Sequence, residues 1–142
     1  MRLGRLMAAA AACLLAGAAW ADEMPLNTVL EGLYQGSGEG ALSLSLINLE
    51  GETFAALITT AVPGRCAGRL SGIGKLERTE MIVENVDSRD DAVCRLTIRF
   101  SRQGKRAQVT SAGQCTYFHG AACGFRGVLE QVVVPAKLRP KK

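Results

Sequence analysis

Polar and apolar residues alternate along most of the chain beyond residue 28. The clearest run covers residues 94–101, where every second side chain is apolar: Cys94, Leu96, Ile98 and Phe100. A period of two puts apolar side chains on one face of a β-strand and polar ones on the other. This run is therefore predicted to be a strand with one face against a core and the other in water.

Seven more segments have the composition of short strands, and glycine-containing turn sequences separate many of them. They cover residues 28–35, 42–46, 53–60, 65–75, 79–86, 105–111 and 124–134. The turn at Glu50-Gly51-Glu52 is short enough for a hairpin with its glycine at positive φ. No segment beyond the N-terminal region shows the 3.6-residue period of a helix. Eight short strands predict one all-β domain, an antiparallel barrel or sandwich.

Closure into a barrel is the more attractive of these two architectures, because a closed sheet has no exposed edge. An aromatic residue lies between glycines at both ends of the strand region, at residues 32–36 and 124–127, which we interpret as the first and last strands meeting. Five glycines inside the predicted strands are interpreted as bends or bulges: Gly32, Gly68, Gly72, Gly74 and Gly127.

The N-terminal segment has the layout of a secretory signal peptide. Residues 1–5 are basic, residues 6–19 are apolar and uncharged, and Ala19 and Ala21 precede a polar sequence. About 14 apolar residues are too few for a transmembrane helix, which needs about 20. Lipidation at Cys13 is an alternative, but alanines precede this cysteine and leucines follow it. We therefore expect cleavage after Ala21, a periplasmic or secreted protein, and no membrane span in the mature chain.

The predicted organisation is a signal peptide at 1–21, an N-terminal lead at 22–27, a β-barrel domain at 28–134 and a basic C-terminal tail at 135–142. The formal net charge of +4 belongs to the two ends, because residues 22–134 hold 11 basic and 13 acidic side chains. The tail is expected to be a solubilising end, with a tether to anionic lipid, glycan or nucleic acid as the alternative. No basic stretch is interleaved with aromatic residues, so no nucleic-acid partner is expected.

An even number of cysteines in a small exported domain predicts disulfides. The four in the mature chain are Cys66, Cys94, Cys115 and Cys123. Because Cys115 and Cys123 are close in sequence around Gly120, we expect them to pair, which leaves Cys66 to pair with Cys94. A zinc site formed by Cys115, His119 and Cys123 is a less favoured alternative, since thiols pair first in an oxidising compartment.

The signatures of common enzymes are missing from the sequence. The chain has a single histidine, His119, and lacks a nucleophile elbow, a phosphate loop and a zinc-protease motif. Asp87, Asp90 and Asp91 do not have the spacing of an EF-hand and are expected to form a solvated turn rather than a calcium site. We therefore predict that the protein is not an enzyme and has no cofactor or metal. An enzyme using His119 would need a partner group that the sequence does not locate.

The segment from Cys115 to Cys123 is the main candidate binding site. It holds Tyr117, Phe118 and His119 in succession, although the mature chain has only six Phe and Tyr residues. Closed by a disulfide, it would present these rings at the tip of a rigid loop, which loses little entropy on binding a partner. In the structural alternative, Tyr117 or Phe118 plugs the end of the barrel and His119 caps a backbone carbonyl.

Arg95 and Arg99 form a second candidate binding site. Both lie on the polar face of one predicted strand, about 13 Å apart at about 3.3 Å per residue. Such a face is suited to recognising an anion. The alternative is cross-strand pairing with Glu77, Glu80 and Glu84 on a neighbouring strand.

In its build, a signal peptide followed by a small all-β body with two disulfides, the chain resembles small bacterial periplasmic β-barrel proteins that include the lysozyme inhibitors. Those inhibitors insert a loop containing Ser-Gly into the lysozyme cleft. Ser37-Gly38 and Ser71-Gly72 are the matching dipeptides, and neither is followed by the tyrosine of that loop. The resemblance implies a non-enzymatic binding or inhibitory protein that contacts a protein partner in the cell envelope or outside the cell. A carrier of a small apolar ligand inside the barrel is the alternative.

Overall fold

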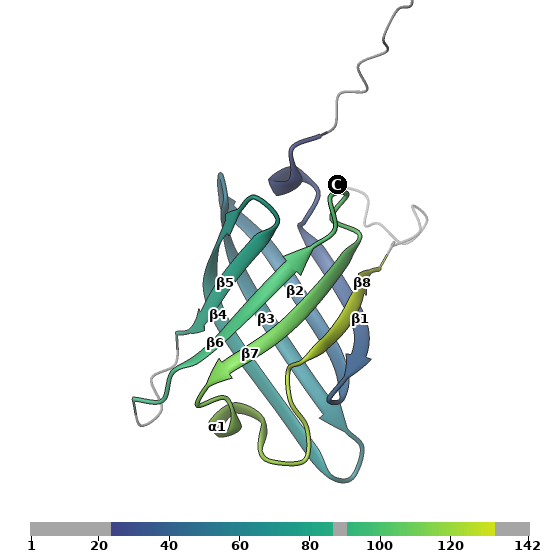
Figure 1. Ribbon diagram of the computed structural model, residues 1–142, viewed down its shortest axis with the longest axis vertical. Helices are drawn as coiled ribbons and strands as arrows, with labels where there is room; N and C mark the ends of the chain where they lie inside the picture. The colour runs from purple at the N-terminus through teal and green to yellow at the C-terminus, as the bar shows by residue number, and fades with distance from the viewer. Residues whose placement is uncertain (1–23, 87–90, 133–142) are drawn as a thin grey trace, which may run out of the picture.

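The computed structural model describes residues 24–86 and 91–132, which form a closed antiparallel barrel of eight strands (Figure 1). The strands are β1 (Gly32–Gly38), β2 (Ala41–Glu50), β3 (Thr53–Val62), β4 (Cys66–Glu77), β5 (Glu80–Asn85), β6 (Cys94–Phe100), β7 (Arg106–Gly113) and β8 (Gly127–Gln131). Each strand pairs with the next along the chain, and β8 pairs with β1. The predicted all-β fold and the meeting of its first and last strands are confirmed.

The alternation of residue types sets the inner and outer faces of the barrel wall. Along β6, every second residue from Cys94 to Phe100 is buried, and the arginines between them are exposed. Tyr34, Phe54 and Phe125 are the largest fully buried side chains, and leucine, isoleucine and valine side chains from the other strands pack around them in one cluster. These side chains occupy the space in which the carrier hypothesis places a ligand.

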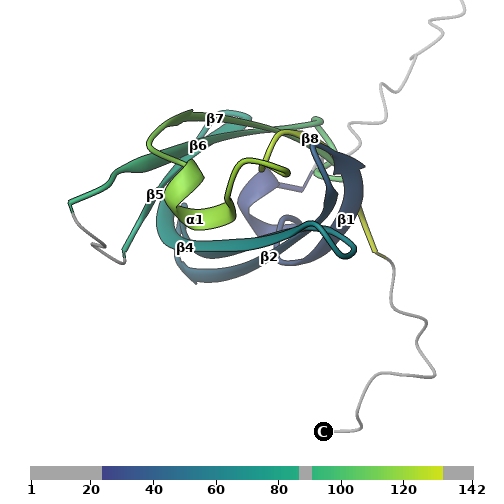
Figure 2. The same ribbon diagram turned by 90° about the horizontal axis from the view of Figure 1, so that it is seen from below.

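Two short helices lie at the ends of the barrel. At one mouth, η1 (Leu26–Thr28) packs Leu26 against the core. There the buried hydroxyl of Tyr34 lies 2.8 Å from the carbonyl oxygen of Gly104 and 3.1 Å from that of Leu30. Burial raises the pKa of Tyr34, because its charged form would lose hydration. At the other mouth, α1 (Thr116–His119) lies across the opening (Figure 2).

Both terminal strands begin later along the chain than predicted, because the residues before each of them take part in another local structure. β1 begins at Gly32 rather than at residue 28, because the chain first forms the turn of η1. β8 covers only Gly127–Gln131 of the predicted residues 124–134, because the chain before it bonds to the turn between β1 and β2. The hairpin glycine predicted at Gly51 is confirmed, with φ of 54°.

Of the bends or bulges expected at the glycines of β4, bulges are absent. The pairing of β3 with β4 continues without a register shift through Gly68, Gly72 and Gly74. These positions are close approaches instead. A Cβ atom at Gly72 would collide with the carbonyl oxygen of Glu84, and one at Gly74 would collide with the side chain of Met81.

The predicted disulfide pairing is wrong. Cys94 pairs with Cys115, and Cys66 pairs with Cys123. The register of β6 with β7 explains the first bridge, because it places Cys94 opposite Gly113 and so brings Cys115, two residues later, close to Cys94. With all four cysteines bridged, Cys115 and Cys123 do not supply thiolates to a zinc site. Two disulfides indicate an oxidising, extracytoplasmic compartment.

Several predictions fall on residues outside the described ranges: the signal peptide with its cleavage site, most of the acidic turn at 87–91, and the basic tail. Within 24–86 and 91–132, no helix is long and apolar enough to cross a membrane. In the same residues, no group of three or more His, Cys, Asp and Glu side chains is arranged to hold a metal ion.

Candidate functional site

The aromatic segment, residues 115–123, is fastened to the barrel wall at both ends. Cys115 is bonded to Cys94 at the start of β6, with Cα atoms 4.5 Å apart. Cys123 is bonded to Cys66 at the start of β4, with Cα atoms 5.9 Å apart. The expected loop, closed on itself by a local bridge, is therefore replaced by a segment that two bridges hold to two different strands.

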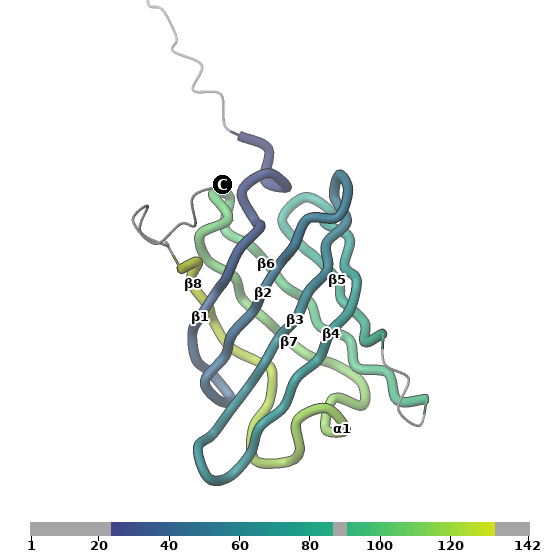
Figure 3. The backbone as a smooth tube through the Cα atoms, turned by 180° about the vertical axis from the view of Figure 1, so that it is seen from behind, coloured from purple at the N-terminus to yellow at the C-terminus, as the bar shows by residue number. Residues whose placement is uncertain are grey.

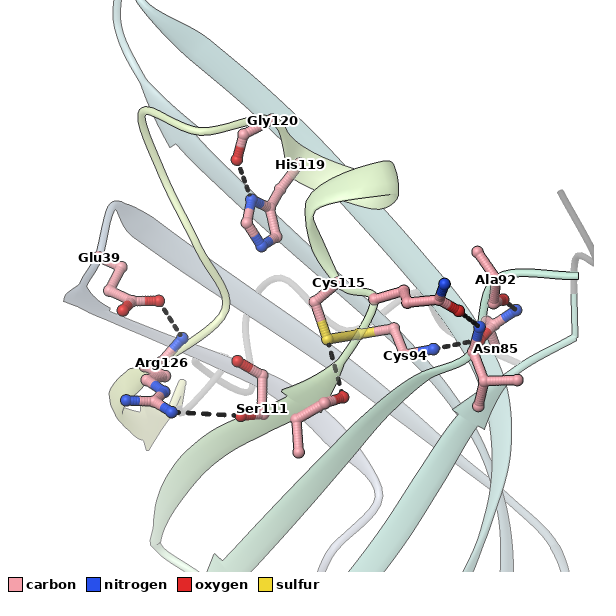
Figure 4. The surroundings of a disulfide bond; sticks show 12 residues. Glu39, Asn85, Ala92, Cys94, Ser111, Cys115, His119, Gly120 and Arg126 are labelled. Atoms are coloured by element: carbon pink, nitrogen blue, oxygen red, sulfur yellow. Dashed lines mark hydrogen bonds between the residues drawn. A yellow bond between two sulfur atoms is a disulfide. The ribbon is translucent and has the colours of Figure 1, made fainter. Parts of the chain in front are cut away.

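Hydrogen bonds reinforce both attachments. Before the segment, the Gln114 N–H donates to the Val93 carbonyl at 2.8 Å, and the Val93 N–H donates to the Gln114 side chain at 3.1 Å. After it, the Gly124 N–H donates to the Glu39 carbonyl at 3.2 Å, and the Glu39 N–H donates to the Arg126 carbonyl at 2.9 Å. Figure 4 shows Glu39 beside Arg126 and the neighbouring bridge between Cys94 and Cys115. A segment held in this way is preorganised for binding.

The single turn of α1 gives Tyr117 and Phe118 different surroundings. Tyr117 is 57% exposed, whereas Phe118 is half-buried and packs against the core cluster. Gly68 on β4 allows α1 to approach the wall, because a Cβ atom at that position would collide with the backbone of His119. Phe118 therefore helps to close the mouth of the barrel, while Tyr117 is presented to solvent.

His119 makes structural contacts. Its Nδ1–H donates to the carbonyl oxygen of Gly120 (Figure 4), and its ring meets Phe125 edge-on at a centroid distance of 5.0 Å. Within the described residues, no carboxylate pairs with this ring.

A surface cavity of about 540 Å³ lies beside α1, between Tyr117 and Phe118 and the lower parts of β3 and β4. The strand residues that line it are Thr59, Thr60, Ala61, Ala67, Gly68, Arg69 and Ser71. Sequence reasoning did not bring these residues together as one site with Tyr117. Strand alternation places Ala67, Arg69 and Ser71 on one face, but only the tertiary position of α1 brings Tyr117 to them.

Arg95 and Arg99 lie on the outer face of the barrel, each paired with a glutamate directly across the β5–β6 ladder. Arg95 lies 2.5 Å from Glu84, and Arg99 lies 2.8 Å from Glu80. The predicted cross-strand pairing is therefore present for these two glutamates. Such exposed pairs contribute at most about 1 kcal/mol each. Neither arginine lines the cavity beside Tyr117, and recognition of an anion at this face stays a prediction.

The two Ser-Gly dipeptides lie in strands. Ser37 and Gly38 end β1, and Ser71 and Gly72 lie in the middle of β4, where both pair with β3. Neither forms a projecting loop of the kind that enters the lysozyme cleft.

Comparison of the chain with protein-family models, with curated proteins and with solved structures finds no significant match. The fold and its bridges define the class, an eight-stranded antiparallel β-barrel with two disulfides.

Proposed function

We propose that this chain is an exported, non-enzymatic binding or inhibitory protein that contacts a protein partner through the aromatic segment. The observation that carries the proposal is Tyr117, which is 57% exposed on a turn fastened by two disulfides. Exposed aromatic rings on rigid elements are typical energetic anchors of protein interfaces, because they bury a large area and lose little entropy on docking.

The packing of the barrel favours a macromolecular partner over a small apolar cargo. Tyr34, Phe54 and Phe125 fill the interior with no exposed surface, so a ligand there would have to displace core side chains. The cavity beside Tyr117 lies at the surface instead, and hydroxyl groups and an arginine contribute to its lining. Surfaces with an aromatic anchor and a polar rim are common at protein interfaces.

Site-specific photocrosslinking tests this proposal in the host cell. A benzoylphenylalanine residue in place of Tyr117 should give a covalent adduct with a protein of the cell envelope or medium. The matched control carries the same residue in place of Ile82, which is 47% exposed on the outer face of β5. An adduct from position 117 and none from position 82 supports the proposal. Adducts from neither position, or equally from both, would refute it.

A further inference from the structure

The lower half of β4 has one edge that no strand within residues 24–86 and 91–132 covers, and we call it the free edge. β4 pairs with β3 along its whole length, but its register with β5 covers only Gly72 to Glu77. Figure 3 shows β5 ending well above the lower end of β4. Among the described residues, no strand pairs with residues 66–70 on the side away from β3.

Two hydrogen bonds define which backbone groups face this edge. The Leu76 N–H donates to the Glu52 carbonyl at 2.8 Å, so the even-numbered residues of β4 direct their backbone groups toward β3. The Val86 N–H donates to the Ser71 carbonyl at 3.0 Å, so the odd-numbered residues face the opposite side. Because these directions alternate along a strand, the N–H and C=O groups of Ala67 and Arg69 face the free edge. Neither residue's backbone has a partner there in the described part of the chain.

The free edge borders the cavity beside Tyr117, and its charge is positive. Ala67 and Arg69 line that cavity together with Tyr117, and Arg65 lines an adjoining cavity that also includes Tyr117. Neither cavity has an aspartate or glutamate in its lining, and no described carboxylate forms an ion pair with Arg65 or Arg69. Within the described residues, the edge therefore combines backbone groups that no strand pairs with, two guanidinium groups outside any ion pair and an exposed aromatic ring.

We propose that this edge binds an extended acidic segment of the partner protein as an added β-strand. Backbone hydrogen bonds to Ala67 and Arg69 would hold the segment, a carboxylate would pair with Arg69, and an apolar side chain would lie against Tyr117. Strand addition of this kind takes its affinity from the main chain and its selectivity from alternate side chains. The inference rests on the proposed function, because it names the form in which that partner is recognised.

A second copy of the chain fits this edge poorly. Antiparallel pairing of two β4 edges centred on Ala67 would place Arg65 opposite Arg69 of the other copy. Pairing centred on Arg69 would place the two copies of that residue opposite each other. Like charges directly across a ladder are destabilising, whereas an acidic strand complements both arginines.

The test uses a phage-displayed library of random 12-residue peptides, selected on the mature protein, followed by synthesis of the selected peptides. Selected peptides should be acidic, and their binding should slow amide hydrogen exchange at Ala67 and Arg69. Ala67→Pro removes one edge N–H, a change that an unpaired edge tolerates, and should weaken binding about tenfold. Ala67→Thr keeps this N–H and should bind as the native protein does.

Charge reversal provides the second arm. Arg69→Glu should weaken binding of the acidic peptides at least tenfold, whereas Arg106→Glu, an exposed change on β7, should leave it unchanged. If Ala67→Pro does not fold, methylation of alternate amide nitrogens in the peptide removes the same hydrogen bonds from the other side. Strand addition would be overturned by peptides that bind without slowing amide hydrogen exchange at Ala67 and Arg69. It would also be overturned by peptides that bind Ala67→Pro and Arg69→Glu as tightly as the native protein, or by a selection that yields no acidic peptides.

These outcomes separate the inference from the function on which it rests. A crosslink from position 117 to a partner that persists in Ala67→Pro and Arg69→Glu would overturn strand addition and leave the proposed function standing. If the protein that carries the crosslinker at position 117 and no other change forms no such adduct, the proposed function itself is refuted.

Discussion

The two disulfides are expected to contribute unequally to stability, because they close loops of different length. The bridge between Cys66 and Cys123 spans 57 residues, and the bridge between Cys94 and Cys115 spans 21 residues inside that loop. With the inner bridge formed, the outer one closes an effective loop of about 36 residues. With the outer bridge formed, the inner one likewise closes an effective loop of about 13 residues. On the chain-entropy model, removing the outer bridge alone should therefore cost about 3.8 kcal/mol and removing the inner bridge alone about 2.9 kcal/mol.

Urea unfolding of two double variants measures this difference. The Cys66→Ala/Cys123→Ala protein should have the lower free energy of unfolding, by about 1 kcal/mol relative to the Cys94→Ala/Cys115→Ala protein. Equal or inverted losses would refute the reasoning from loop length. Such a result would place the difference in the folded packing of the bridges or in residual structure of the unfolded chain.

The pairing itself is tested by digestion without reductant. No lysine or arginine lies between Cys115 and Cys123, so trypsin leaves both in the peptide 107–126. The observed pairing links that peptide to both 66–69 and 90–95 in one three-chain species. Chymotryptic cleavage after Tyr117 or Phe118 then assigns a partner to each cysteine. A separate peptide 107–126 with an internal bridge would contradict this topology.

Further substitutions test the packing at the two mouths. Tyr34→Phe leaves the Gly104 carbonyl without its donor and should lower the free energy of unfolding in urea by about 1–2 kcal/mol. Because burial raises the pKa of Tyr34, this residue ionises in the unfolded state before it does in the folded one. Above pH 10, the free energy of unfolding of the native protein should therefore fall by up to about 1.4 kcal/mol per pH unit relative to that of Tyr34→Phe. Parallel pH profiles of the two proteins would contradict this. Thr60→Val removes a buried hydroxyl that has no hydrogen-bond partner among the described residues. The variant should have a higher urea midpoint and a free energy of unfolding about 1 kcal/mol greater. A lower free energy of unfolding would show that the hydroxyl is hydrogen-bonded. In thermal melts, Phe118→Ala should cost about 2 kcal/mol and Tyr117→Ala less than about 0.5 kcal/mol, and equal losses would contradict the different burial of the two rings.

The barrel could be predicted because the alternation in residues 94–101 and in the other strands is local information, and it determines which face each side chain takes. The bridge between Cys94 and Cys115 could also have been predicted from the sequence. The two cysteines lie almost symmetrically about the turn near Gly104, and pairing the flanking strands about that turn places Cys94 against Gly113. Closeness in sequence alone favours pairing Cys115 with Cys123, whereas the register of β6 with β7 favours pairing Cys115 with Cys94.

The aromatic segment could be located but not resolved into roles. A single helical turn has no detectable period, so α1 leaves no pattern in the sequence. Which ring is exposed depends on how α1 lies over Gly68, a contact between segments about 50 residues apart. The free edge of β4 likewise arises from a difference in strand length, since β5 ends at Asn85 while β4 continues down to Cys66.

The most direct test of recognition through the aromatic segment is the affinity of the crosslinked partner, once purified, for the native protein and for Tyr117→Ala. Isothermal titration should show binding to the variant about thirtyfold weaker, corresponding to a hot-spot residue, at an unchanged melting temperature. Ile82→Ala, the matched exposed control, should bind as the native protein does. Affinities for Tyr117→Ala and the native protein that agree within twofold would contradict the account.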